Sequence, residues 1–211
     1  MAAEQHHGRL SRGLIVRVGR SVYPLLERAS LTWLITLVHR LKYRVISTPS
    51  WRVLAILDLL AAAEVRVWVA GGWGIDALVG RQNRPHLDVD LVISDDGPPY
   101  ERVAQVLTDE GFRPDGSYHT PGIAIPWCHV WRHETGHKVE VLPVPLDKPP
   151  FAAKVAAADG WQPFTDGTID GQRVPCLSAE LQFLLHTGYP QREIDSRDVA
   201  LLREHLSSYV A

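Results

Sequence analysis

The sequence has little sulfur and no long apolar run. Its 211 residues include two cysteines and one methionine. Two cysteines are too few for a disulfide framework and fit a reducing compartment. The most apolar stretch, Leu31–Val38, is followed at once by His39 and Arg40, whereas a membrane-spanning helix needs about 20 apolar residues. No clear signal peptide follows the first arginines. These absences argue against a membrane span and indicate a cytoplasmic protein.

The chain also lacks a large net charge, since 22 Lys and Arg face 24 Asp and Glu for a balance of -2. The distribution is uneven, because residues 1–50 hold eight Lys and Arg but two acidic residues, a net charge of +6. A basic segment on an acidic body can meet RNA, an anionic membrane surface or the body itself. An RNA-binding arm and a solvated helix that docks on the body both stay open.

Apolar periodicity predicts a chain of mixed helices and strands. Strands are expected over 65–70 and 87–93, a hairpin over 128–133 and 137–142, and helices over 14–46, 51–64, 73–80, 100–110, 179–186 and 196–206. Residues 151–178 are glycine-rich and are expected to be irregular, with turns at Asp166-Gly167 and Asp170-Gly171. The predicted fold class is α+β, a mixed sheet with helices on one side and a C-terminal helical part.

The segment from Gly71 to Ile93 contains the residues that point to chemistry. Asp88 and Asp90 alternate with apolar residues on a predicted strand, so both carboxylates project from the same face. Two close carboxylates repel each other unless a cation lies between them, and Mg²⁺ prefers such oxygen ligands and is often shared with substrate phosphates. Gly71 and Gly72 form a turn before a helix, where backbone N–H groups can face a phosphate chain. Each pattern alone is weak, since an exposed strand with two surface aspartates is the simpler alternative.

Together these residues resemble a known family. The segment Gly71–Asp76, then Gly80, then Arg84-x-His86-x-Asp88-x-Asp90 is similar to the signature of the aminoglycoside and lincosamide nucleotidyltransferases, within the DNA polymerase beta-like superfamily. The similarity runs from about Trp51 to Leu206. It implies a nucleotidyltransferase-type mixed sheet, with a basic N-terminal helical arm at 1–50, a core at 51–146 and a C-terminal, partly helical acceptor-side region at 147–211.

The resemblance also implies a reaction. Such enzymes move a nucleoside monophosphate from a nucleoside triphosphate, here expected to be ATP, to a hydroxyl of a small molecule. Two Mg²⁺ ions are expected on Asp88, Asp90 and a third carboxylate, and Glu140 occupies the matching place on a later strand. Many relatives have Asp there and some have Glu, so the geometry of the third metal contact and of the general base stays open. A cross-strand partner for a surface charge is the alternative reading of Glu140.

The remaining expected site residues bind the two substrates. Gly71, Gly72, Arg84 and His86 are expected on the nucleotide side, with Arg84 either on a phosphate oxygen or capping the sheet, and His86 orienting Asp88 or the loop. Tyr189, Asp195 and Asp198 resemble the family's acceptor-binding segment. Asp195 and Asp198 share a helix face and would suit a polyamine, but acidic residues also favour helix N-termini without any ligand.

Three hypotheses follow from the sequence. The first is a metal-dependent nucleotidyltransferase that acts on a small molecule such as an aminoglycoside or lincosamide, with a role in antibiotic resistance. The second is a toxin-like nucleotidyltransferase that acts on RNA or tRNA through the basic arm. The third is a non-catalytic protein that retains the fold. The sequence gives no oligomeric state.

Overall fold

The computed structural model of the chain describes residues 47–94, 98–119, 127–144, 162–187 and 193–208. The helix expected over 14–46 lies outside these residues. Within them the helices are α3 (Ser50–Ala62), α4 (Gly71–Val79), α5 (Pro98–Asp109), α7 (Ala179–Thr187) and α8 (Glu193–Ser208), and the strands are β1 (Trp68–Ala70), β2 (Asp88–Ile93), β3 (Phe112–Tyr118), β4 (Cys128–His133), β5 (Lys138–Pro143), β6 (Phe164–Ile169) and β7 (Gln172–Leu177). No helix among them combines the length and hydropathy that a bilayer span requires.

The described strands form one mixed sheet in the order β3-β4-β5-β2-β1-β7-β6. β2 pairs antiparallel with β1 and parallel with β5, and β7 pairs parallel with β1. The predicted α+β class with a mixed sheet is therefore confirmed. Because β6 and β7 belong to the region expected from residue 147 onward, that region contributes strands to the same sheet as the core.

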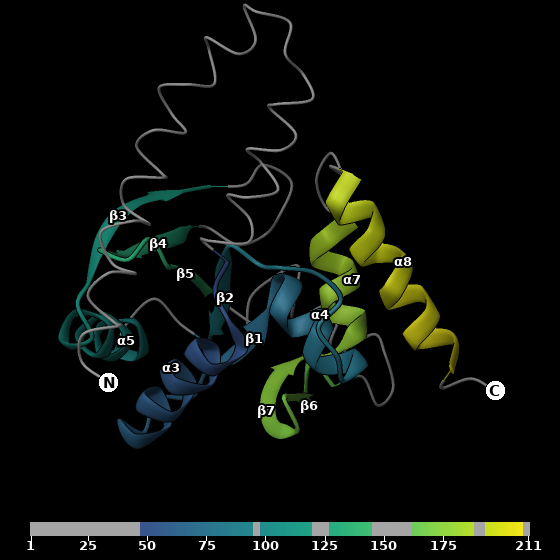
Figure 1. The fold of residues 1–211 in the computed structure, drawn as a ribbon, viewed down its shortest axis with the longest axis horizontal. Coiled ribbons are helices and arrows are strands. Elements are labelled where there is room, and N and C mark those ends of the chain that lie inside the picture. Colours follow the sequence, from purple (N-terminus) through teal and green to yellow (C-terminus); the bar gives the residue numbers. More distant parts are fainter. Residues whose placement is uncertain (1–46, 95–97, 120–126, 145–161, 188–192, 209–211) are drawn as a thin grey trace, which may run out of the picture.

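Apolar side chains on both faces of this sheet are buried, with α3 and α5 over one face and α7, from the expected C-terminal helical part, over the other. Val89, Leu91 and Ile93 of β2 join the main core beneath α3 and α5, whereas Val92 joins a second cluster with Leu181 of α7. Successive residues of a strand point to opposite faces, which explains the division. Figure 1 shows α3 near α5, and α7 beside α8 on the other side of the molecule.

The sequence patterns did not predict two polar strands. β6 and β7 form an antiparallel hairpin where irregular structure was expected. The turn at Asp170-Gly171 is confirmed by positive φ angles of 48° and 79°, but Asp166-Gly167 lies inside β6. Gly167 has a packing reason instead, because a Cβ there would lie 2.5 Å from the carbonyl oxygen of Ala77 on α4.

The sequence patterns also did not predict β3, because its composition is unusual for a strand. Its Pro114-Asp115-Gly116 sequence is typical of a turn, yet the segment pairs with β4 at the edge of the sheet, with a register shift between Pro114 and Ser117. An edge strand tolerates proline and a bulge, since one of its sides has no ladder to complete. Four helices also start earlier than expected, α3 at Ser50, α4 at Gly71, α5 at Pro98 and α8 at Glu193.

Candidate active site

Four charged side chains project from one face of two adjacent parallel strands. The register of β2 against β5 places Asp88 opposite Lys138 and Asp90 opposite Glu140. Their apolar neighbours Val89 and Val139 point to the other face, into the main core. The alternation predicted for Asp88 and Asp90 is confirmed, and the sheet brings Glu140 to their side.

Lys138 lies between two of the carboxylates. Its Nζ is 2.6 Å from Asp88 Oδ2 and 2.5 Å from Glu140 Oε1. Burial alone would lower the pKa of Lys138, but the charges of Asp88 and Glu140 outweigh burial and raise it. The ammonium is therefore a fixed positive charge among three carboxylates.

Glu140 is held from both sides. Its Oε1 accepts from Lys138, while its Oε2 accepts a 2.5 Å hydrogen bond from the Tyr118 hydroxyl and a longer one, 3.4 Å, from the Cys128 thiol. Burial would raise the pKa of Glu140, but the Lys138 charge and these hydrogen bonds bring it below its usual value. Glu140 is thus an ionised carboxylate in a nearly buried position.

Asp90 has the opposite electrostatic environment. Burial, together with the nearby charges of Asp88 and Glu140, raises the pKa of Asp90 well above its usual value. Its carboxylate lies over Gly71, the first residue of α4, so that a Cβ on Gly71 would be 1.9 Å from Asp90 Oδ2. The N-terminus of a helix carries a partial positive charge that favours an anion. Asp90 therefore rests on α4 while it repels its two acidic neighbours.

The glycine pair serves this close packing. Gly71 has a φ of +56°, which L-residues rarely adopt, and its missing side chain makes room for Asp90. A Cβ on Gly72 would lie 2.2 Å from His86 Nδ1 and 2.7 Å from Arg84 Nη2. The two positions expected to face a phosphate chain are therefore the positions against which Asp90, His86 and Arg84 pack.

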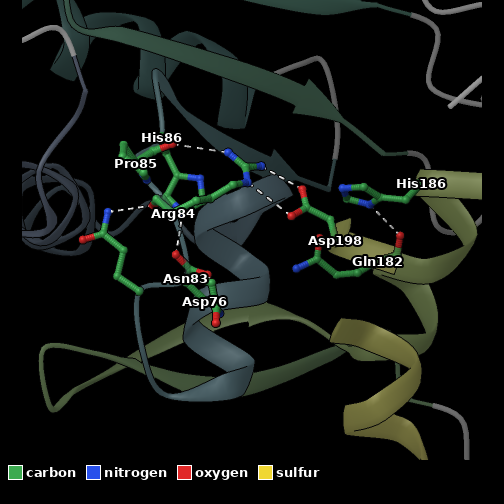
Figure 2. A network of polar contacts seen from close by, with 9 residues as sticks. Asp76, Asn83, Arg84, Pro85, His86, Gln182, His186 and Asp198 are labelled. Carbon is green, nitrogen blue, oxygen red and sulfur yellow. Dashed lines mark hydrogen bonds and ion pairs between the residues drawn. The ribbon is translucent and has the colours of Figure 1, made fainter. Parts of the chain in front are cut away.

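A polar network fixes the loop between α4 and β2 (Figure 2). The buried Asp76 of α4 contacts His86 Nε2 at 2.5 Å and accepts a 2.9 Å hydrogen bond from Asn83 Nδ2. The His86 ring packs on Trp73, with their centroids 4.9 Å apart. The loop is further anchored by the Thr48 N–H, which donates to the His86 carbonyl at 2.7 Å. His86 is thus part of the support beneath β2.

Arg84 connects this loop to the C-terminal helix. Its guanidinium contacts both carboxylate oxygens of Asp198, with Nη2 to Oδ2 at 2.7 Å and Nε to Oδ1 at 3.2 Å. Burial would lower the pKa of Arg84, but Asp198 raises it. Asp195 and Asp198 are both buried on α8, while Tyr189 lies outside the described residues. Of the expected acceptor residues, Asp198 therefore reaches the loop next to the carboxylates.

Asp88, Asp90 and Glu140 have the ligand chemistry of a magnesium site, but their side chains are not arranged around one ion position. Three carboxylates provide the hard oxygen ligands that Mg²⁺ takes, and burial together with the charges of Asp88 and Glu140 raises the pKa of Asp90. Across residues 47–94, 98–119, 127–144, 162–187 and 193–208, however, no three His, Cys, Asp or Glu side chains are arranged to hold one ion. Lys138 separates Asp88 from Glu140.

Sequence reasoning missed three of these residues. Lys138 had a readable signal, because a residue two positions before Glu140 shares its strand face. Asp76 was part of the family motif but had no assigned role. Tyr118 had no usable signal, since it reaches Glu140 only through the unpredicted pairing of β3 with β4.

Comparisons with known proteins agree with this geometry. Residues 52–202 match the family model described as aminoglycoside-2''-adenylyltransferase. A lincosamide resistance protein of Staphylococcus haemolyticus is 29% identical over 155 residues, which cover 70% of this chain and 90% of that protein. A 2''-aminoglycoside nucleotidyltransferase of Klebsiella pneumoniae is 49% identical over 43 residues, 19% of this chain and 24% of that protein.

Solved structures give the same result. The lincomycin-bound crystal structure of the lincosamide antibiotic adenylyltransferase LnuA has a TM-score of 0.58 at 26% identity and covers 75% of this chain and 99% of that chain. The structure of ANT(2'')-Ia in complex with adenylyl-2''-tobramycin has a TM-score of 0.55 at 18% identity, covering 76% and 90%, and supports the fold. The nucleotidyltransferase-type fold is therefore confirmed.

Replacing Gly71 should damage the site as well as the backbone. Gly71→Ala meets an unfavourable φ and the Asp90 carboxylate, whereas Gly171→Ala meets an unfavourable φ of +79° with nothing within 4 Å. We expect Gly171→Ala to cost about 1–2 kcal/mol of unfolding free energy and Gly71→Ala clearly more, measured by chemical denaturation. Equal losses would show that Asp90 does not pack on Gly71 as described.

Removing the charge of Asp90 should stabilise the metal-free protein. Because the folded-state pKa of Asp90 is raised, its ionised form destabilises the fold at neutral pH, and the gain from Asp90→Asn should vanish in acid, where Asp90 is protonated. We expect the melting temperature at pH 7 to rise by about 2–4 °C, equivalent to roughly 1 kcal/mol. The exposed Asp58→Asn is the control and should leave it unchanged. A lower melting temperature for Asp90→Asn at pH 7 would contradict this electrostatic account.

Proposed function

The chain belongs to the aminoglycoside-2''-adenylyltransferase family, and on that basis we propose that it transfers AMP from ATP to a hydroxyl of a lincosamide or aminoglycoside antibiotic. The family is one of nucleotidyltransferase enzymes and implies ATP as the donor. The observation that carries the proposal is the shared face of β2 and β5, where Asp88, Asp90 and Glu140 project together beside the N-terminus of α4. A role in antibiotic resistance follows if the product no longer binds its target.

The chemistry assigned to the carboxylates follows their environments. Asp88 and Asp90 would hold Mg²⁺, which when bound supplies positive charge to the phosphate chain and to the departing pyrophosphate. Glu140 is the general base, because it is ionised and already accepts a hydrogen bond from a hydroxyl, that of Tyr118. The acceptor oxygen bonds to the α-phosphorus, the bond from the α-phosphorus to its bridging oxygen breaks, and the proton passes to Glu140.

The nucleotide-side residues support this reaction mainly by position. Gly71 and Gly72 let Asp90, His86 and Arg84 pack on the start of α4, and the first N–H groups of that helix favour an anion. His86 holds the loop through Asp76. Arg84 remains a candidate phosphate contact, which would require it to share or leave Asp198. Positioning of this kind accounts for much of the catalysis of phosphoryl transfer.

The acceptor side favours a lincosamide as the first substrate to test. The lincosamide relatives match most of this chain and nearly all of their own length. In addition, Asp198 already pairs with Arg84, so its charge is not available to a polyamine while that pair is intact. Asp195 is buried as well, so the expected contacts of an aminoglycoside acceptor would centre on Tyr189.

RNA is the second candidate acceptor, and the observation that favours it is the charge of +6 on residues 1–50. Such a segment would attract phosphates without regard to sequence, and its contribution would weaken with added salt. Under this alternative the arm at 1–50 binds the acceptor and the remainder performs the transfer. A small-molecule transferase would not need the arm.

An acceptor screen tests the proposal. The full chain is incubated with ATP, Mg²⁺ and lincomycin, tobramycin or tRNA, and each product is examined by mass spectrometry. We expect one adenylyl group on lincomycin or tobramycin and none on tRNA, and a chain without residues 1–46 should retain this activity. Asp88→Asn and Asp90→Asn should each lower turnover by about 10²-fold or more, as loss of a group that stabilises the transition state does.

The outcomes separate the hypotheses. Label on tRNA that disappears with residues 1–46 would replace the antibiotic with RNA as acceptor. Folded protein that neither binds ATP nor labels any acceptor would support the non-catalytic alternative. Full turnover by Asp90→Asn would remove the carboxylate pair from the mechanism.

A further inference from the structure

The cation at the centre of the carboxylates is a residue of the chain itself. Lys138 contacts Asp88 Oδ2 and Glu140 Oε1 at 2.6 and 2.5 Å. Asp90 follows Asp88 on the same face of β2 and lies opposite Glu140 in the strand register. An ion bound by all three carboxylates would need the position between Asp88 and Glu140 that the Lys138 ammonium occupies.

Glu140 is poorly arranged as a metal ligand. Both of its oxygens accept hydrogen bonds, Oε1 from Lys138 and Oε2 from Tyr118 and Cys128. Mg²⁺ needs oxygen ligands at about 2.0–2.1 Å in near-octahedral geometry, and a protonated amine cannot be one of them. An ion bound to both oxygens of Glu140 would therefore compete with Lys138 for Oε1 and with Tyr118 and Cys128 for Oε2.

Asp88 and Asp90 have more carboxylate oxygens available to bind a metal ion than Glu140 has. Asp88 gives one oxygen, Oδ2, to Lys138. No hydrogen bond or ion pair involves the Asp90 side chain among the described residues, and its carboxylate lies at the N-terminus of α4. These two carboxylates can thus take an ion without disturbing Glu140.

We propose that Lys138 takes the place of the second divalent ion, so that the enzyme works with one Mg²⁺ on Asp88 and Asp90 and with the Lys138 ammonium beside Glu140. This inference rests on the proposed function and replaces the two ions expected from the family resemblance. Lys138 acts as a positioning residue that bridges Asp88 and Glu140 and holds Glu140 toward the acceptor hydroxyl.

Counting bound ions tests this directly. The full chain is titrated with Mn²⁺ in the presence of α,β-methylene-ATP, which cannot be cleaved at the reacting bond, and bound ions are counted by electron paramagnetic resonance. We expect one nucleotide-dependent ion per chain in the wild type and in Lys138→Arg, and two in Lys138→Met, which removes the charge. Arg132→Met is the matched control, because Arg132 lies opposite Lys138 on β4 but pairs with Asp115, and it should bind one ion.

Two ions in the wild type, or equal counts in the wild type and Lys138→Met, would overturn the role of Lys138. If wild type with two ions still adenylylates an antibiotic, the proposed function survives and only the lysine inference fails. Absence of any nucleotide-dependent ion together with absence of transfer would overturn both. Lys138→Arg keeps the test decisive if Lys138→Met does not fold, since two ions in Lys138→Arg would count against a charge-for-charge replacement.

Discussion

The register between β2 and β5 is the constraint on which the rest of the site depends. It sets Asp90 beside Glu140 and Asp88 beside Lys138, and because side chains alternate along a strand, the intervening residues complete the main core. A shift of one residue would turn the charged groups into that core and the apolar ones outward. Burial of Val89, Leu91, Val139 and Val141 therefore fixes the carboxylates on the functional face.

Glu140 and Asp90 on this face lie in opposite electrostatic environments. Glu140 is stabilised as an anion by Lys138 and two further donors, whereas Asp90 is buried beside like charges with α4 as its support. Such a cluster is costly for the fold and suited to binding cations. The Arg84–Asp198 contact joins the adjoining loop to α8, so that the helix expected on the acceptor side also steadies the loop expected on the nucleotide side.

The sequence predicted the parts of this arrangement that have a local pattern. Alternation on β2 predicted that Asp88 and Asp90 share one face. The family resemblance, and no local pattern, added Glu140 to them. Local patterns could not show that Asp90 packs against Gly71, because that contact joins residues 19 positions apart. They also missed β3 and β6, whose Asp-Gly pairs are typical of turns and whose strand structure depends on pairing partners.

The location of bound nucleotide tests the central claim most directly. In a crystal structure of the full chain with α,β-methylene-ATP and Mn²⁺, anomalous scattering would locate the ion independently of the protein density. We predict an ion in contact with Asp88 and Asp90, with the phosphate chain next to the start of α4. Nucleotide bound elsewhere, for example in the hollow lined by Leu57, Trp68 and Phe164, with the carboxylates still closed around Lys138, would contradict the account.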